Sequence, residues 1–470
     1  MPTVTGNVFL RLLIVCVVWT RAVALHLNAV ARIAPSTMQL RHIFYVYAAE
    51  DASDTTFGQP RVTMKLKLSP SKAAPAGYLW DYKSVEVSMF PLEYFDQIVD
   101  TASFCSAPGS VGARFVPRPG SPQNVIVTHA LTDDDATHVD ALRVSGVYVL
   151  LVTNCGGVED LGVAGTVAVR NPHGYLQANE HGKTGMYGWL ALLYTASFLL
   201  WVGLYARRWS RLSLLQSELM SIHLLAVGEC LAMRWLYSEL NRTGEFSETC
   251  YRLGTAMSLA KTCMLLRWAA QAPQTLGIDI EAESDMKFRV ALVLHAGAAI
   301  NFRSSLLARD LGAYGLDTTV GICAVPVTIT GTALFGYGLY SLESACRHAL
   351  ERQRAQDPAR LLVLTMAVLV VAGIAAVAAL VAQFADPGRG ASVSKWGTHA
   401  MFSEGFSQLV CALALGLSTL VWRPTDADAK SQGYGKVHVE ADLESVPVGA
   451  AAGIDGESTK PRTGVTPDSD

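Results

Sequence analysis

The order of apolar and polar residues changes character once along this chain, within residues 171–189. Before this stretch, short runs alternate apolar and polar side chains with a period of two, which is typical of strands with one buried face. After it come apolar segments of about 20 residues, the length that an α-helix needs to cross a hydrocarbon core. The pattern therefore predicts a β domain in water followed by a helical membrane domain.

Five runs before the change have the composition of strands, because they alternate or are rich in β-branched residues. They cover residues 61–68, 84–90, 123–129, 146–153 and 163–170. Segments rich in Pro, Gly and Ser, such as 107–122, separate them and indicate turns. Several short strands joined by turns predict a small β-sandwich over residues 25–175.

Seven apolar segments after the change are each close to the length of one membrane span. Lipid offers the backbone no hydrogen-bond partners, so each span must be helical. The segments lie at 187–206, 214–236, 251–271, 289–308, 318–341, 361–384 and 397–422. The fold class that we predict is a multi-pass α-helical membrane protein, with a seven-helix domain over 187–424 and a linker over 176–186.

The N-terminus has the layout of a cleavable signal peptide over residues 1–24. Arg11 precedes an apolar run at 12–19, and small residues follow at 22–24, where signal peptidase cleaves. The run is short for a membrane span, although an uncleaved anchor is the alternative. With either reading, the β domain enters the lumen of the secretory pathway.

The distribution of positive charge agrees with this orientation. The positive-inside rule places arginine-rich connections in the cytosol. The first and fifth connections between spans are rich in arginine, whereas the connection 385–396, which this topology places in the lumen, carries only Arg389 and Lys395. Asn241 begins an Asn-Arg-Thr glycosylation sequon in another connection that this topology places in the lumen.

Residues 425–470 lack apolar periodicity and are rich in Asp, Gly, Ser, Thr and Lys, which is typical of a disordered tail. Tyr434 and Val437 have the Tyr-x-x-apolar spacing of a peptide that a cytosolic sorting adaptor binds. Such short matches also arise by chance, and this alternative stays open.

Composition excludes several classes of function. Hydrophobic residues make up 51% of the chain and charged residues 16%, with a formal net charge of -3. The chain is too apolar for a soluble protein of this size, and its charge does not suit nucleic acid. Nine cysteines lie far apart without a Cys/His cluster, so no metal or other cofactor is expected. The sequence also lacks a Walker loop, G-x-S-x-G and H-E-x-x-H, so we do not expect an enzyme.

Cys105 and Cys155 are the two cysteines of the predicted sandwich. In an oxidising lumen they are expected to form a disulfide, and the alternative is two free thiols.

Charged residues inside the predicted spans are the main candidates for function, because they are costly in lipid and usually face the bundle interior. Four of them, Glu229, Lys261, Arg303 and Glu404, are predicted to form one polar cluster in the lumenal half of the bundle. At 1.5 Å per residue, Glu229, Lys261 and Glu404 lie roughly 10–16 Å below the lumenal ends of their segments, so Glu229 and Lys261 are placed to form an ion pair. Two interpretations stay open: a cavity open to the lumen for a lipid, cargo or ion, and ion pairs that only fix helix packing.

Four groups of residues carry a family resemblance. They are Gly146-Val147-Tyr148 running to Asn154-Cys155, Asn171-Pro172 with Gly174-Tyr175-Leu176 and Glu180, Glu229 with Tyr237-Ser238-Glu239, and Trp422-Arg423-Pro424 preceded by Trp396 and Glu404. In this order and spacing they resemble the lung seven-transmembrane receptor family, also called GOST, the Golgi-localised seven-transmembrane proteins with a GOLD-like lumenal domain. The ending Trp422-Arg423-Pro424 is most similar to the branch that contains a yeast Golgi protein.

The resemblance implies a function. It implies a Golgi or endosomal membrane protein in protein trafficking, acting in retrograde transport or cargo sorting, with membrane lipids, a protein cargo or lumenal partner and a cytosolic adaptor as partners. The family's bundle is similar to that of the Wnt-carrying protein Wntless, which implies a cavity accessible to lipid. The alternatives are a G-protein-coupled receptor with a lumenal or extracellular ligand domain, and an ion channel or channel regulator.

Overall fold

The computed structural model describes residues 31–33, 37–52, 55–69, 85–94, 127–131, 137–154, 161–206, 214–271, 282–310, 317–351, 373–374 and 401–422. The predicted signal peptide, Cys105, Cys155, Tyr434 and Val437 lie outside the described residues. The predictions made for them therefore stay predictions.

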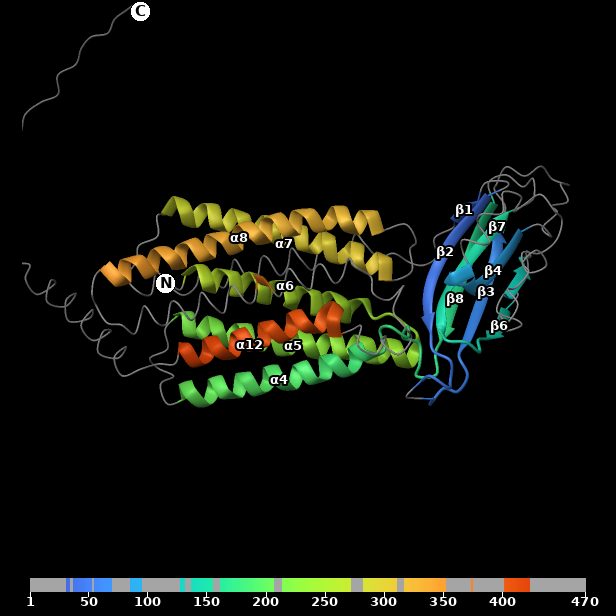
Figure 1. Ribbon diagram of the computed structural model, residues 1–470, viewed down its shortest axis with the longest axis horizontal. Coiled ribbons are helices and arrows are strands. Elements are labelled where there is room, and N and C mark those ends of the chain that lie inside the picture. The colour runs from blue at the N-terminus through green and yellow to red at the C-terminus, as the bar shows by residue number, and fades with distance from the viewer. Residues whose placement is uncertain are drawn as a thin grey trace, which may run out of the picture. The chain divides into compact units, whose positions relative to one another are not determined.

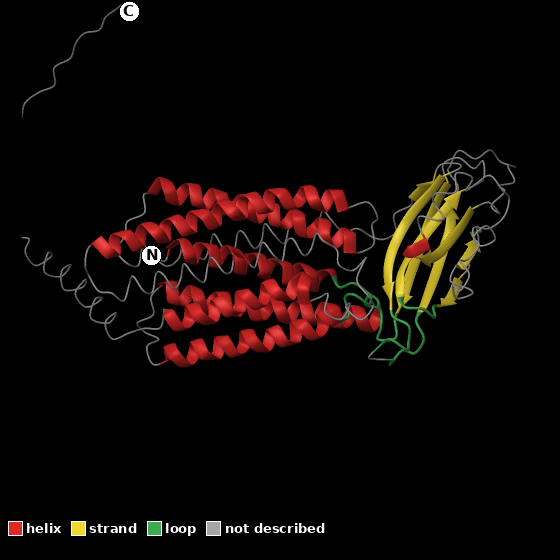
Figure 2. Ribbon diagram, viewed as in Figure 1, coloured by secondary structure: helices red, strands yellow, loops and turns green. Residues whose placement is uncertain are grey.

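The N-terminal region folds into eight described strands (Figures 1 and 2). They are β1 (Ala31–Ile33), β2 (Thr37–Val46), β3 (Arg61–Ser69), β4 (Val85–Pro91), β5 (Val127–Ala130), β6 (Thr137–Ala141), β7 (Gly146–Asn154) and β8 (Leu161–Arg170). The strands form two antiparallel sheets, with the orders β1-β8-β3-β6 and β2-β7-β4-β5. A single-turn helix, Leu92–Tyr94, follows β4.

The two sheets bury their inner faces in one hydrophobic core. This core includes Val62, Met64 and Leu68 of β3, together with Phe44 of β2 and Val87 of β4. Alternate residues of β2, β3, β4, β7 and β8 supply this core, which is the arrangement of a β-sandwich. The predicted sandwich is present.

Tyr148 on β7 is buried in the core of the sandwich, and its hydroxyl donates a hydrogen bond to the carbonyl oxygen of Val144 at 2.9 Å. Burial raises the pKa of Tyr148 to about 12, so the phenol keeps its proton at any physiological pH.

All five predicted strands are present, but β1, β2 and β6 were not predicted. In β2 the pairing with β7 shifts between Leu40 and His42, and this irregularity breaks the period of two that identifies a strand. In β6 the usual pattern is inverted, because Val139 is exposed while its neighbours His138 and Asp140 are partly buried. The sequence pattern of β6 therefore resembles that of a polar loop.

Polar side chains bridge the two sheets where edge strands β5 and β6 approach each other. His129 of β5 lies 2.8 Å from a carboxylate oxygen of Asp140 on β6, measured from Nε2 to Oδ2. The rings of His129 and His138 stack with centroids 4.1 Å apart. Partial burial and the neighbouring His129 lower the pKa of His138, although Asp140 opposes the shift. Charged side chains that point inward at an edge also protect a sheet from pairing with another chain.

Acidification is expected to weaken the sandwich through His138. The unfolded chain binds a proton at the ordinary histidine pKa, whereas the folded chain binds it only at a lower pH. Stability is therefore lost as the pH falls from about 6.5 through the lowered pKa. Thermal unfolding of wild type and His138→Gln between pH 7.5 and 5 should show a smaller loss in the variant. An equal loss in both proteins would contradict this role for His138.

The C-terminal region is helical (Figure 1). Its described elements are α4 (Gly182–Tyr205), α5 (Leu214–Thr243), α6 (Glu248–Gln271), α7 (Ala282–Asp310), α8 (Asp317–Glu351), a π-helical turn η7 (Met401–Gly405) and α12 (Phe406–Val421). Six of the seven predicted segments thus overlap a described helix. The segment 361–384 lies outside the described residues except for 373–374. Helix α4 begins at Gly182, so the last five residues of the predicted linker are helical.

Three of the described helices are long and apolar enough to cross a membrane, rather than the predicted seven. These spans are Gly182–Tyr205, Gln216–Thr243 and Thr319–Ser341, and Phe406–Leu420 is a shorter apolar helix. Helices α6 and α7 have the length of a span but much lower mean hydropathy. Charged residues within them, such as Lys261 and Arg303, account for part of this difference.

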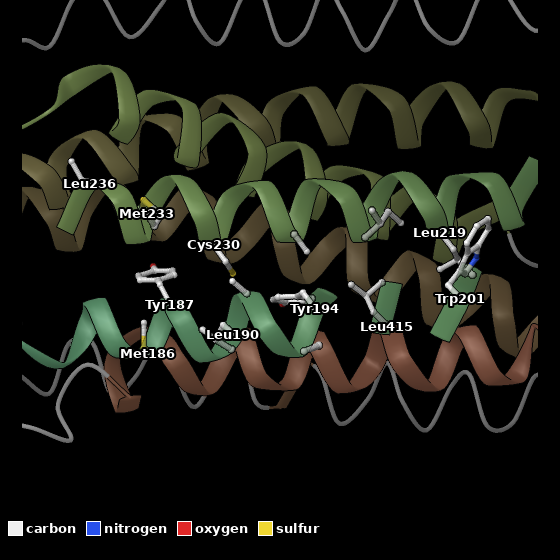
Figure 3. Packing of buried hydrophobic residues seen from close by; sticks show 14 of the residues in the cluster. Met186, Tyr187, Leu190, Tyr194, Trp201, Leu219, Cys230, Met233, Leu236 and Leu415 are labelled. Carbon is white, nitrogen blue, oxygen red and sulfur yellow. The ribbon is translucent and has the colours of Figure 1, made fainter. Parts of the chain in front are cut away.

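Helices α4, α5 and α12 share a hydrophobic core (Figure 3). Tyr187, Tyr194 and Trp201 project from α4 toward α5 and α12, and all three side chains are buried. α4 also packs along α5, and α5 packs along α6. The outward faces of these helices are apolar as well, and Trp189 and Trp235 are 75% and 66% exposed. A helix that is apolar on its outer surface fits a lipid environment better than water.

Candidate functional site

A buried polar group joins three helices. Lys261 of α6 lies with Nζ 2.6 Å from Oε2 of Glu229 on α5, and both side chains are almost fully buried. Gln408 of α12 completes the group: its Nε2 donates to Oε1 of Glu229 at 2.7 Å, and its Oε1 accepts from Nζ of Lys261 at 2.8 Å. We call Glu229, Lys261 and Gln408 the deep triad. One ion pair and the two hydrogen bonds of the Gln408 amide therefore connect the three side chains.

A second polar group lies around the π-helical turn that precedes α12. Glu404 lies 3.2 Å from Nζ of Lys183 on α4 and accepts a hydrogen bond of 2.5 Å from the hydroxyl of Tyr187. Lys183 is only 4% exposed and also contacts Glu180 at 2.8 Å. We call Glu180, Lys183, Tyr187 and Glu404 the upper cluster. π-Helical turns often occur at functional sites, so the position of Glu404 on one supports a special role.

The two groups follow each other along the helix axes. Gln408 comes four residues after Glu404, which is about one helical turn or 6 Å. Tyr194 extends from α4 to this turn of α12, where its hydroxyl donates to the backbone and side-chain oxygens of Gln408. The polar contacts therefore continue from the start of α4 to the interior of the bundle.

Two tryptophans give the depth of these groups. Trp189 on α4 and Trp235 on α5 are exposed, and stacking of Tyr187 on Tyr237 shows that these parts of α4 and α5 lie side by side. Tryptophan favours the membrane–water interface. Glu229 lies six residues from Trp235 along α5, and Lys183 lies six residues from Trp189 along α4, about 9 Å in each case. With these tryptophans at an interface, the upper cluster would lie at the level of the headgroups and the deep triad inside the membrane.

Arg303 was predicted to join the polar cluster, and the structure brings its charge within electrostatic reach of Glu404 but not into a direct ion pair. The carbonyl oxygen of Arg303 accepts a hydrogen bond of 3.0 Å from the hydroxyl of Tyr251. Within the described part of the chain, its guanidinium forms no ion pair. Of the four predicted residues, Glu229 and Lys261 contact each other, and Glu404 belongs to the upper cluster instead.

The segment 171–181 between β8 and α4, which contains the first six residues of the predicted linker, is hydrogen-bonded on both sides. The side chain of Asn171 is fully buried and acts like an additional peptide group. Its Nδ2 donates to the carbonyl oxygens of Tyr45 and Leu176, and its Oδ1 accepts from the backbone N–H of Tyr47. Asn171 thus connects the end of β2 to the segment that leads into α4.

Asn241, at the end of α5, holds the same segment from the other side. Its Oδ1 accepts from the N–H of Leu176 at 3.1 Å, and its Nδ2 donates to the carbonyl oxygen of His173 at 2.8 Å. Gly174 has a φ of 137°, and a Cβ at this position would lie 2.3 Å from the carbonyl oxygen of Asn241. Only glycine fits this approach. A glycan would be attached to Nδ2 of Asn241, the atom that donates to His173 in the structure. Glycosylation at Asn241 stays a prediction.

Two substitutions are expected to separate the contacts of Asn241 from its glycosylation. Asn241→Ala leaves the N–H of Leu176 and the carbonyl of His173 without these partners, which costs about 1–3 kcal/mol. Thr243→Ala removes the sequon but keeps both contacts. Limited proteolysis within residues 171–181 should accelerate in Asn241→Ala only, whereas loss of a glycan would change the gel mobility of both variants. Equal cleavage of both variants would contradict the role of Asn241 in holding the segment.

Sequence reasoning missed three members of the site. Gln408 is uncharged, so a search for intramembrane charges passes over it. Lys183 and Tyr187 lie in the first two turns of α4, and the sequence did not show that both side chains are buried. One signal was available: positions 183, 187 and 194 are four and seven residues apart, so they share one face of a helix.

Comparisons with known proteins add no relatives. The chain matches no protein-family model, and no curated protein is similar to it in sequence.

Proposed function

We propose that this chain is a non-enzymatic membrane protein of the Golgi and endosomes, acting in retrograde transport or cargo sorting. In this proposal, seven helices span the membrane, the sandwich is a GOLD-like domain in the lumen, and the tail is cytosolic. The family resemblance in the sequence supports the trafficking role and membership of the lung seven-transmembrane receptor family. The helices described above support a membrane location.

The observation that carries the membrane part of the proposal is the inverted polarity of the helices. Lys261, Glu229 and Lys183 are among the most buried side chains, whereas Trp189, Leu192 and Leu231 are exposed. Burying charges while exposing large apolar side chains is unfavourable in water and is expected in lipid. The charges are balanced by partners, as burial in a bundle interior requires.

The arrangement around the linker supports a role in binding a partner in the lumen. Asn171 and Asn241 tie the linker to the sandwich and to α5, and Lys183 ties the start of α4 to Glu404. A partner that displaces the sandwich would therefore disturb the upper cluster first. In the proposal, this is how the lumenal domain reports bound cargo to the helices.

Proximity labelling tests the trafficking role. A labelling enzyme fused after residue 24 and microscopy of the same cells give the lumenal partners and the compartment together. The proposal predicts steady-state Golgi and endosomal staining, with cargo and trafficking proteins among the labelled partners. Strict plasma-membrane residence with ligand-driven G-protein activation would favour a receptor instead.

The buried charges favour one alternative, an ion channel or channel regulator. Glu404 lies at the headgroup level, where an ion would enter, and the deep triad follows it. Purified protein in liposomes should then carry currents that change in Glu404→Gln. The absence of currents from folded protein would leave the charges as packing and positioning groups, as the trafficking proposal expects.

A further inference from the structure

The outer face of the sheet β1-β8-β3-β6 carries a row of cations. Val62, Met64 and Leu68 of β3 point into the core, so the alternate residues Arg61, Lys65 and Lys67 point outward, and all three are exposed. Arg170 of β8 pairs directly with Arg61 and lies on the same face. At about 3.3 Å per residue, the row extends roughly 20 Å along β3.

The cations in this row are not neutralised. None of Arg61, Lys65, Lys67 and Arg170 forms an ion pair with a described residue, and Arg170 instead lies over the ring of Phe57 at 5.7 Å. The other described outward positions on β3, β6 and β8 are Thr, Ser, Val, Ala and Gly, without a carboxylate. Arg61 and Arg170 stand directly opposite each other, and like charges in this position destabilise a sheet.

A charge arrangement that destabilises the folded sheet indicates a binding site, because an anionic ligand would relieve the repulsion between the cations. Lys65 stands between Thr166 of β8 and Thr137 of β6, so hydroxyl groups flank the cation on both sides. Arginine and lysine beside hydroxyls are suited to sulfate and carboxylate groups. Val139 is the one large apolar side chain among the described outward positions of these three strands, so a protein partner finds few sites for the apolar anchors that usually dominate an interface.

We infer that this basic face, formed by Arg61, Lys65, Lys67 and Arg170, binds a linear sulfated polysaccharide. The row is straight and about 20 Å long, which suits an extended polyanion whose charges repeat along its length. Recognition rests on charge and hydroxyl groups, since Val139 is the one large apolar side chain at the described outward positions of β3, β6 and β8. Contact with such a polysaccharide in the cell requires the lumenal placement that we propose for the sandwich, but binding by the purified protein does not.

Heparin is the probe for this site. Full-length protein in zwitterionic lipid nanodiscs is passed over immobilised heparin at several salt concentrations, with chemically desulfated heparin and polyglutamate as competing probes. We expect binding that weakens steeply with salt and disappears on desulfated heparin. Lys65→Gln with Lys67→Gln should weaken binding by about tenfold or more and lower the slope of log affinity against log salt by roughly two.

Two further variants distinguish this site from a general effect of charge or of folding. Arg143→Gln with Arg242→Gln removes the same charge at positions outside the sheet, and this control should bind heparin like wild type. Arg61→Gln should weaken heparin binding and slightly raise the unfolding temperature, because it removes the repulsion from Arg170. Unchanged binding in the lysine variant, or tighter binding of polyglutamate than of heparin, would overturn the inference. Either result would leave the trafficking proposal intact.

Discussion

Replacing Lys261 by methionine is expected to lower the free energy of unfolding by about 3–5 kcal/mol, because it leaves Glu229 charged and buried without its partner. The methionine side chain has nearly the shape of the lysine side chain, so the effect of Lys261→Met reports the loss of charge rather than a change of volume. The double variant with Glu229→Gln should recover at least half of this loss. Glutamine at position 229 carries no charge, and its amide is placed to hydrogen-bond Gln408.

Cys230, which is a free and buried cysteine of α5 one residue after Glu229, provides the measurement. The rate at which Cys230 reacts with a thiol reagent in lipid nanodiscs, followed by mass spectrometry of its peptide, reports unfolding of the protein. Arg267→Met is a control on the same helix, since Arg267 is about one-third exposed and lies 3.3 Å from Glu218. This control should cost clearly less than Lys261→Met, because Arg267 and Glu218 are both more exposed than Lys261 and Glu229. If the double variant is as unstable as the sum of the single ones, the ion pair is not the source of the effect.

Gly165 is the position where one added methyl group should damage the sandwich most. Gly165 has a φ of 147°, and a Cβ there would lie 1.9 Å from the carbonyl oxygen of Lys65 in the neighbouring strand. Backbone atoms of paired strands cannot separate by this distance without losing the β3–β8 ladder. Gly165→Ala is therefore expected to cost more than about 3 kcal/mol or to prevent folding of the sandwich.

Gly58→Ala is the matched control for this clash. Gly58 has a φ of 74°, but no atom lies within 4 Å of the Cβ that alanine would add. It therefore tests backbone strain alone, which is expected to cost about 1 kcal/mol. Circular dichroism and protease resistance of the full chain compare the two variants. Similar stabilities for Gly165→Ala and Gly58→Ala would contradict the close approach of β3 and β8 at Gly165.

The sequence predicts the elements of this fold better than their contacts. Period-two alternation identified β3 and β4, because their inner faces are apolar throughout. It missed β6, whose inward residues His138 and Asp140 are polar because they lie at an open edge of the sandwich. A pattern based on hydrophobicity is uninformative where an edge strand places polar groups on the inside.

The same distinction applies to the candidate site. Counting residues along each helix gave the depth of Glu229, Lys261 and Glu404, and the contact between Glu229 and Lys261 is consistent with that count. Depth does not give the direction in which a side chain points around its helix. Glu404 therefore joined Lys183 rather than Lys261, and the neutral Gln408 supplied the third member of the deep triad.

Protease protection in sealed Golgi vesicles tests the central claim most directly, that a lumenal sandwich precedes a helical domain in the Golgi membrane. Antibodies against residues 31–170 and against residues 425–470 follow the two ends of the chain during digestion. The account predicts that the sandwich is protected until detergent opens the vesicles, while the tail is removed at once, in vesicles that co-purify with Golgi enzymes. Digestion of the sandwich in intact vesicles, or absence of the protein from Golgi membranes, would contradict it.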